Sequence, residues 1–308
     1  MYPQIQRQAL RANKAANIVY LNNPKVGCST IKNILWNSLA DEPRARKVDV
    51  HDVEASPFDN RIDQMDWLAD ARIFTFVRNP FVRVVSAYLN KIADQKPIQW
   101  SHFVRRYGVD SGPVIGFDAF IKLISEDAPE RLDPHWRPQH LNLMYPFVQP
   151  NMMGKLERMD DLLPQVLERY LGLPPAPVKR KSRHGTNAGA TYLDYFRNRD
   201  TLDRVLALYA EDFRYFGYAT DLDAPVEGTD LPPSSDHRHD RLAALSDFRR
   251  AGSASDRADA LSRLDTLVQA DAMARDDGFV GAWLANVKQK SDAKPVKPRA
   301  QAGVSPGS

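Results

Sequence analysis

The sequence predicts an α/β fold, in which a parallel sheet is flanked by helices and a helical extension follows at the C-terminus. Three segments, which begin near residues 17, 72 and 151, each combine a short apolar strand with a helix that follows it directly. Units of this kind in series build a parallel sheet with right-handed crossovers. After residue 222 the composition changes to a linker rich in Pro, Ser and Asp, and leucines at helical spacing follow it.

The first strand–loop–helix unit has the composition of a phosphate cradle. The β-branched and aromatic run at residues 18–21 predicts a buried strand, the loop at 24–27 ends it, and apolar residues at helical spacing begin at Ile31. Backbone N–H groups at such a helix start point at an anion, and the helix dipole favours its charge. The unit is therefore P-loop-like. Its Lys25 precedes Gly27, whereas the nucleotide-triphosphatase loop places a lysine after its second glycine, so the pattern points away from ATP.

The second unit predicts another phosphate site. An apolar run at residues 73–77 predicts a strand, and Arg78 stands where it ends. Pro80 suits the first turn of the helix that follows, and Ser86 lies off the apolar stripe of that helix. A guanidinium fork beside a hydroxyl is typical of phosphate binding. Two such sites on adjacent units require a ligand with phosphates at two separated positions.

The remaining segments of this domain extend and cover the sheet. Residues 47–51 are read as a short strand, which would bring His51 to the C-terminal edge of the sheet, where ligands bind. Residues 94–150 are read as an irregular insertion that builds the substrate cleft. The unit at 151–157 supplies a further strand, and a helix around 202–213 closes the core.

The chain is expected to divide into a main domain at 1–222, a helical extension at 223–287 and a disordered tail at 288–308. Within the extension, helices are expected around 241–250 and 258–273. The extension carries no recognisable chemistry, so we expect it to pack against the main domain or to mediate self-association.

Composition bounds the class of protein. The 308 residues contain 43% hydrophobic residues, enough for a substantial core, and the net charge of +3 argues against a general nucleic-acid surface. The single cysteine, Cys28, excludes an internal disulfide and suits a reducing compartment. The sequence has no apolar run of 18 residues and no apolar signal core at its N-terminus, which favours a cytoplasmic protein without a transmembrane segment.

Two motifs resemble those of a known family. PKVGCSTIK at 24–32 resembles the 5′-phosphosulfate-binding loop, and FVRNPFVRVVSAY at 76–88 the 3′-phosphate-binding segment, of sulfotransferases that use 3′-phosphoadenosine 5′-phosphosulfate (PAPS). The likeness is to carbohydrate sulfotransferases of the chondroitin 4-O and HNK-1 type and to their soluble bacterial relatives, and it spans about residues 15–220. Three further stretches fit the same family: HWRPQ at 135–139, MGKLERMDDL at 153–162 and LYAEDFRYFGY at 208–218.

The resemblance implies an enzyme that moves a sulfuryl group in line from PAPS, its co-substrate, to a hydroxyl acceptor. A glycan or a glycosylated small molecule is the acceptor that the family implies, with no metal and no nucleic-acid partner. The family likewise implies the donor contacts, which are Lys25, Gly27, Cys28, Ser29, Thr30, Arg78 and Ser86. Lys25 is also assigned a catalytic role, because its charge stabilises the departing phosphate. Lys32 and the basic run at 179–184 are either further anion contacts or solvated surface groups.

A hydroxyl acceptor also needs a general base. His51 is the first choice, because a histidine at the comparable place acts as the base in related heparan sulfotransferases. His135, within the HWRPQ stretch, is the second choice.

Two other classes of protein stay open. A P-loop kinase-like phosphotransferase would require magnesium and a Walker lysine–serine pair, which the sequence lacks. A non-catalytic nucleotide-binding or scaffold protein would keep the fold without the base. Selective binding of 3′,5′-bisphosphoadenosine over ATP without magnesium excludes the first class, and turnover with PAPS excludes the second.

Overall fold

The computed structural model describes residues 10–42, 44–45, 47–52, 55–60, 67, 70–174, 186–228 and 240–292. These residues form two compact units. The larger unit contains the described residues of 10–60, 72–145 and 150–228, and the smaller contains those of 67–71, 146–149 and 240–292.

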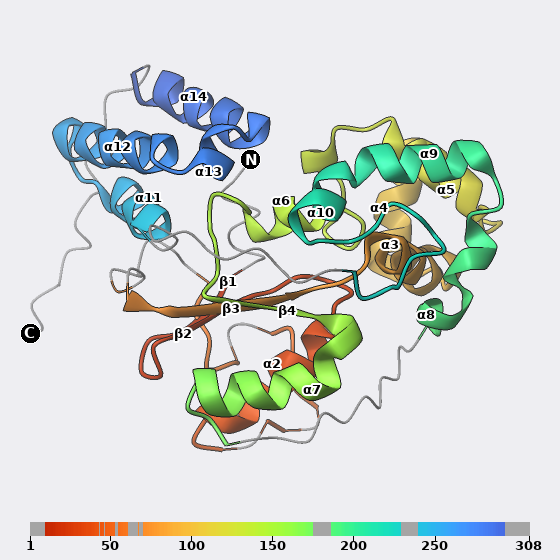
Figure 1. The fold of residues 1–308 in the computed structure, drawn as a ribbon, viewed down its shortest axis with the longest axis horizontal. Coiled ribbons are helices and arrows are strands. Elements are labelled where there is room, and N and C mark those ends of the chain that lie inside the picture. Colours follow the sequence, from red (N-terminus) through yellow and green to blue (C-terminus); the bar gives the residue numbers. More distant parts are fainter. Residues whose placement is uncertain are drawn as a thin grey trace, which may run out of the picture. The chain divides into compact units, whose positions relative to one another are not determined.

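The larger unit is built around a four-stranded sheet with the order β1-β2-β3-β4 (Figure 1). β2 (Ile18–Leu21), β3 (Arg72–Val77) and β4 (Met152–Lys155) are parallel, which confirms the predicted α/β class. β1 (Leu10–Asn13) pairs antiparallel with β2 and was not predicted, because its short LRAN sequence has no strand pattern.

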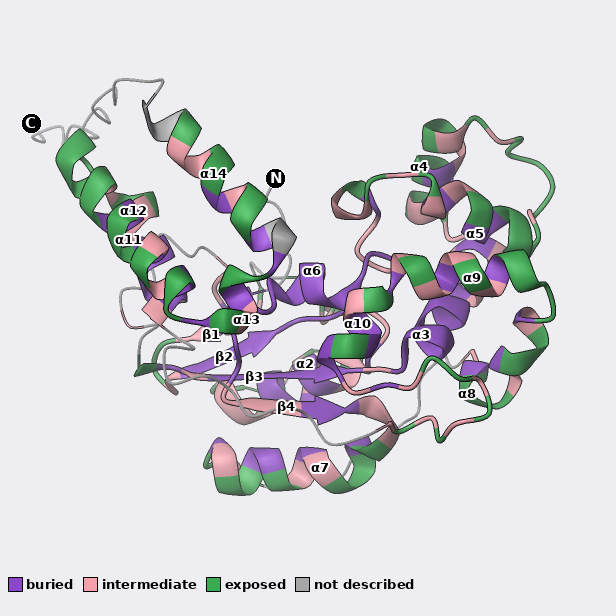
Figure 2. Ribbon diagram, turned by 45° about the horizontal axis from the view of Figure 1, so that its top comes forward, coloured by how far each residue is buried: buried purple, intermediate pink, exposed green. Residues whose placement is uncertain are grey.

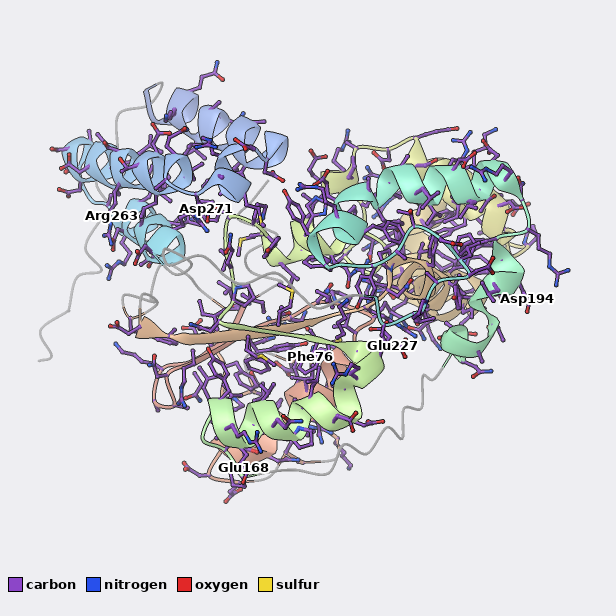
Figure 3. All side chains as sticks on the ribbon, viewed as in Figure 1. Phe76, Glu168, Asp194, Glu227, Arg263 and Asp271 are labelled. Atoms are coloured by element: carbon purple, nitrogen blue, oxygen red, sulfur yellow. The ribbon has the colours of Figure 1, made fainter. Side chains whose placement is uncertain are left out.

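Helices α2 (Cys28–Leu39) and α7 (Met159–Gln165), the latter continued by the π-helical turn η6 (Val166–Tyr170), cover one face of this sheet (Figure 1). Their apolar residues form one core cluster with alternate side chains of β2 and β3, including Phe76, which Figure 3 labels. Gly154 is the register partner of Phe76 in β4, and a Cβ there would lie 2.4 Å from the Phe76 ring. The sheet therefore needs glycine at this position to hold the ring.

α3 (Pro80–Ala87) starts directly after β3. The side chain of Asn79 caps it by accepting from the N–H groups of Phe81 and Val82, and Pro80 occupies the first turn as predicted. Every residue of α3 is buried, as Figure 2 shows. Because β2 and β3 are parallel neighbours, the loops that follow them meet at the same edge of the sheet.

The reading of residues 94–150 as an irregular insertion is wrong, because helices occupy much of this segment. Aromatic and aliphatic residues such as Trp100, Phe103, Phe120 and Ile124 recur at helical spacing and are buried there. The further helical elements of the unit are η3 (a π-helix, Tyr88–Ala93), α4 (Pro97–Tyr107), α5 (Phe117–Ser125), η4 (Pro129–Arg131), α6 (Gln139–Leu143), η5 (Leu156–Arg158), α8 (Ala188–Thr191), η7 (Tyr192–Tyr195), α9 (Arg199–Leu208) and α10 (Ala210–Tyr215).

The strand expected at residues 47–51 is also wrong, since these residues form turns. The side chain of Asp49 accepts a hydrogen bond of 2.9 Å from the N–H of His51. An aspartate that bonds the backbone two residues ahead favours a turn over a strand.

The smaller unit contains α11 (Asp240–Arg250), α12 (Ala254–Gln269), α13 (Ala272–Arg275) and α14 (Gly278–Asp292). The first two confirm the helices expected near 241–250 and 258–273. α14 includes residues 288–292, which the sequence analysis assigns to a disordered tail, and residues 293–308 lie outside the described part of the chain. Among the described residues, no helix has both the length and the apolar character to cross a membrane.

Candidate functional site

Gly27 shapes the loop between β2 and α2. Its φ of +75° lies in the left-handed region, and a Cβ would come within 2.9 Å of the Met159 sulfur and 3.2 Å of Leu156 Cδ1. Both its conformation and its surroundings therefore require glycine. No side chain of the described residues caps the first turn of α2. The backbone amides of Cys28, Ser29 and Thr30 thus begin a helix in the way that suits an anion.

Lys25 lies in the same loop, half-buried and also in the left-handed region with φ at 69°. Burial, followed by the positive charges of Arg78 and Lys91, lowers the pKa of Lys25 to about 7. The Arg78 guanidinium donates a hydrogen bond of 3.2 Å to the Lys25 carbonyl. The structure therefore brings together Lys25 and Arg78, which the sequence assigned to two separate phosphate sites.

Arg83 ties three segments of the site together and was missed by the sequence analysis. It is 1% exposed, and its guanidinium donates to the carbonyls of Pro24 at 3.1 Å, Pro134 at 3.0 Å and Arg137 at 2.8 Å. Carbonyl oxygens satisfy its donors without cancelling its charge. The region around Lys25 is consequently rich in buried positive charge, which an anion would neutralise.

Gln139 is a second residue that the sequence analysis did not single out. Its fully buried side chain accepts from the Arg78 N–H at 2.9 Å and donates to the Arg78 carbonyl at 2.8 Å. The same amide oxygen accepts from Asn23 Nδ2 at 3.0 Å, and Asp212 accepts from the Gln139 N–H at 2.6 Å. One amide therefore fixes the position of Arg78 relative to the loop that follows β2.

Ser86 is 3% exposed, and its hydroxyl lies 3.0 Å from the hydroxyl of Thr186. Ser86 belongs to the buried helix α3, whereas Thr186 precedes α8, so the pair joins two distant parts of the chain. The basic run at 179–184, which precedes Thr186 in the chain, lies outside the described residues.

His51 lies against the start of α2. Its Nε2 is 3.1 Å from the Ser29 hydroxyl, and its Nδ1 contacts the Lys32 ammonium. The residue is exposed as a whole, but its ring lies against the protein, and this loss of solvation, followed by the charge of Lys32, lowers its pKa to about 4. Lys32 is itself fully buried, and burial lowers its pKa to about 8. Lys32 is thus no solvated surface lysine.

His135 forms a close pair with Asp133. Its Nδ1 lies 2.6 Å from Asp133 Oδ1, and the same oxygen accepts from the His135 backbone N–H at 2.9 Å. Burial lowers the pKa of His135, although Asp133 opposes the shift, and the charges of Lys91 and Lys25 lower it further. The charge of His135 in turn lowers the pKa of His51. Both candidate bases therefore lie within electrostatic reach of one site.

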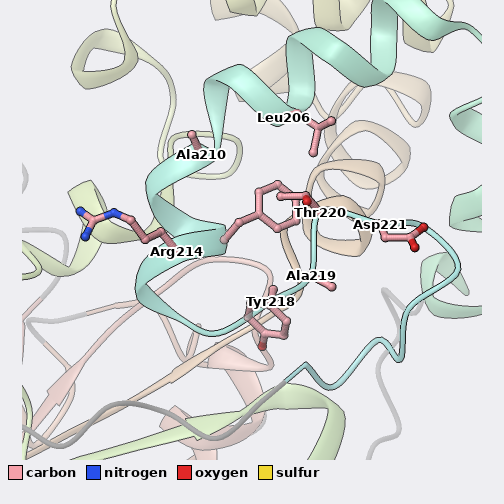
Figure 4. Close-up of a pocket in the computed structure, with 8 residues that line it drawn as sticks. Leu206, Ala210, Arg214, Tyr218, Ala219, Thr220 and Asp221 are labelled. Atoms are coloured by element: carbon pink, nitrogen blue, oxygen red, sulfur yellow. The ribbon is translucent and has the colours of Figure 1, made fainter.

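Glu157 bonds the backbone of the segment that joins β3 to α3. It accepts from the Asn79 N–H at 2.9 Å and is 3.0 Å from the Tyr218 hydroxyl, and burial raises its pKa. Tyr218 also lines a pocket of about 430 Å³ between α9, α10 and residues 218–221 (Figure 4). No residue of the segment 24–32, called the donor loop below, lines this pocket, so the pocket is not the site built by Lys25 and Arg78.

These groups define what the site can do. A helix N-terminus, a cluster of cations and the hydroxyl pair of Ser86 and Thr186 can hold a ligand with two anionic groups. Two histidines nearby, each with a depressed pKa, are neutral at pH 7 and can accept a proton.

Comparisons with known proteins agree with this chemistry. A family model described as the sulfotransferase family matches residues 8–219. Carbohydrate sulfotransferase 14 of Homo sapiens is 29% identical over 223 residues, which cover 65% of this chain and 57% of that protein. The Mus musculus protein of that name is 30% identical with the same coverage, and carbohydrate sulfotransferase 12 of Mus musculus is 29% identical over 47% of this chain and 39% of its own length. The chain therefore spans less than two thirds of these relatives. No solved structure matches it significantly.

Proposed function

Because the chain belongs to the sulfotransferase family, we propose that it transfers a sulfuryl group from PAPS to a hydroxyl of a carbohydrate. The observation that carries this proposal is the convergence of three cationic residues, Lys25, Arg78 and Arg83, around the loop that precedes α2. The names of the relatives support a carbohydrate acceptor.

The residues present fit the donor. PAPS carries about four negative charges, and when bound it supplies an activated sulfuryl group on its 5′-phosphate and a second anionic handle at its 3′-phosphate. Lys25 and the amides of Cys28, Ser29 and Thr30 would hold the 5′-phosphosulfate end, with Gly27 giving the backbone room to approach. Arg78 and Ser86 would hold the 3′-phosphate.

The protein's own part in the reaction is to position the partners and to stabilise charge that develops during transfer. Lys25 would stabilise the phosphate as it gains negative charge. A histidine, His51 or His135, accepts the proton that the acceptor hydroxyl loses. Neither the sulfuryl transfer nor the proton transfer changes an oxidation state.

Two measurements test the proposed function. Wild-type protein should bind 3′,5′-bisphosphoadenosine at least about tenfold more tightly than ATP without magnesium, a difference of about 1.4 kcal/mol. It should also transfer radiolabel from PAPS to an acceptor in a panel of desulfated glycans, lipids and small phenols. Equal affinity for the two nucleotides would support a kinase-like protein, and selective binding without any turnover would support a non-catalytic one.

A further inference from the structure

Taking the proposed function as its basis, the geometry points to His135 as the general base, oriented by Asp133, with His51 acting as a support of the donor loop. His51, which the family resemblance favours as the base, would therefore have a structural role instead. Three observations support this division: the Asp133–His135 pair, the bridge made by Arg83, and the contacts of both His51 nitrogens.

The Asp133–His135 pair fixes which nitrogen of the ring carries the proton. The hydrogen bond and charge of His135 outweigh the effect of burial and lower the pKa of Asp133, which stays a carboxylate and can only accept. At 2.6 Å, Nδ1 of the neutral ring must donate to it, so the lone pair lies on Nε2. Within the described part of the chain, no protein group bonds to that Nε2. This is the arrangement of a base held by a carboxylate.

Arg83 sets the position of this pair relative to the donor loop. One guanidinium donates to the carbonyls of Pro24 and Pro134, the residues that immediately precede Lys25 and His135. Because Arg83 is buried and bonds both carbonyls, the backbone just before Lys25 and the backbone just before His135 are held at a fixed separation. An in-line transfer needs such a separation between its two ends.

His51 is engaged differently. The Lys32 ammonium can only donate, so it occupies the lone pair of His51 Nδ1, and Nε2–H is then directed at the Ser29 hydroxyl. Both nitrogens therefore bond residues of α2. His51 thus orders Ser29 and Lys32 at the donor loop, and its lone pair is not available to an acceptor.

Nε2 of His135 takes the hydroxyl proton of the acceptor while the acceptor oxygen forms its bond to sulfur. The bond between sulfur and the 5′-phosphate oxygen breaks, and that oxygen keeps the electron pair. The products are the sulfate ester and 3′,5′-bisphosphoadenosine, and the imidazolium of His135 returns its proton to water.

Turnover and donor affinity of four variants test the assignment: His135→Ala, Asp133→Asn, His51→Ala and, as a matched control, the exposed His102→Ala of α4. The probes are radiolabelled PAPS with desulfated chondroitin, and PAPS with water alone, from which inorganic sulfate is released. Donor affinity is measured with 3′,5′-bisphosphoadenosine, and thermal melting checks that each variant is folded.

We expect His135→Ala and Asp133→Asn to lower turnover by roughly 10²–10⁴-fold, with donor affinity changed by less than about twofold. His51→Ala should weaken donor affinity by roughly 2–10-fold, as expected for a lost hydrogen bond, and retain turnover at saturating PAPS. His102→Ala should match wild type. Any other pattern among the three site variants overturns the assignment. A wild type that neither transfers nor hydrolyses PAPS refutes the proposed function itself.

A spectroscopic measurement covers the case in which a variant fails to fold. Long-range nitrogen-15 NMR of wild-type protein at pH 7 should show His135 with its proton on Nδ1, and Asp133→Asn, whose amide can donate, should shift that proton to Nε2. A wild-type ring with its proton on Nε2 contradicts the inference whatever the kinetics show.

Discussion

At the scale of single residues, we expect two lysines, Lys25 and Lys32, to make donor binding sensitive to pH. The pKa of Lys25 is lowered to about 7 and that of Lys32 to about 8, so both are partly neutral in mildly alkaline solution. A phosphate bound nearby favours the charged form and raises both values. Binding of 3′,5′-bisphosphoadenosine near pH 8 should therefore take up protons, and affinity should fall as the pH rises above about 7.

Isothermal titration calorimetry in two buffers with different ionisation enthalpies measures this proton uptake directly. Lys25→Arg keeps a charge that does not titrate in this range and should take up fewer protons than wild type. An affinity that stays constant between about pH 6.5 and pH 9 would show that neither lysine faces the ligand.

Arg78 is expected to make a charge-assisted contact with the 3′-phosphate. Arg78→Ala should remove roughly 1.5–3 kcal/mol and weaken the affinity for 3′,5′-bisphosphoadenosine by about one to two decades. Arg105→Ala on the exposed face of α4 is the control and should leave affinity unchanged. If the two variants bind equally well, Arg78 has no part in donor binding.

Lys25 is expected to serve the chemical step more than donor binding. Lys25→Ala should lower turnover more than it lowers donor affinity, because its charge matters most when the leaving phosphate develops its own. Unchanged turnover at saturating PAPS would remove Lys25 from the mechanism.

At the scale of elements, the start of α2 depends on one glycine. Gly27→Ala forces a Cβ into the left-handed region and against Met159, so the free energy of unfolding should fall by roughly 1–3 kcal/mol. Gly189→Ala in α8 has open space around it and should be neutral or slightly stabilising. Urea unfolding compares the two. An equal effect of both substitutions would mean that the loop can relax around the extra carbon.

The junction between the two loops depends on Gln139. Gln139→Leu leaves the Arg78 N–H and carbonyl without their buried partner, which should cost roughly 1–3 kcal/mol of stability. Donor affinity should fall as well, because Arg78 loses its fixed position. Gln165→Leu, at an exposed position of α7, is the control. A Gln139→Leu protein with wild-type donor affinity would show that Arg78 is positioned by other contacts.

The elements that the sequence predicts well are those with local patterns. β2, β3 and β4 follow from short apolar runs, and α3 follows from Pro80 and its apolar stripe. Arg83 and Gln139 could not be found in this way, because their partners are main-chain groups more than 50 residues away along the chain. In the sequence, Arg83 stands within an ordinary apolar helix and Gln139 begins a short one, so neither position indicates its role.

At the scale of the whole molecule, the smaller unit has its own buried ion pair. Arg241 is fully buried, bonds Asp271 at 3.0 Å and donates to the carbonyls of Phe147 and Pro146. Asp271→Ala leaves that guanidinium without its partner and should cost roughly 3–5 kcal/mol. Arg263→Ala, which breaks an exposed pair with Asp247, should cost less than about 1 kcal/mol.

Calorimetry measures both changes in the full chain, where the two units need not unfold together. We expect Asp271→Ala to lower the melting transition of the smaller unit and to leave bisphosphoadenosine binding intact. A loss of donor binding would mean that the larger unit depends on the smaller for its fold.

The left-handed backbone at Lys25 has a consequence for how this loop can evolve. A side chain at φ 69° is strained, and glycine would relieve that strain at the same position. Lys25→Gly should therefore melt at a higher temperature than Lys25→Ala, while both lose turnover. Selection for stability alone would favour glycine at this position, so a variant selected for heat resistance that gains glycine here should lose turnover as it gains thermal stability.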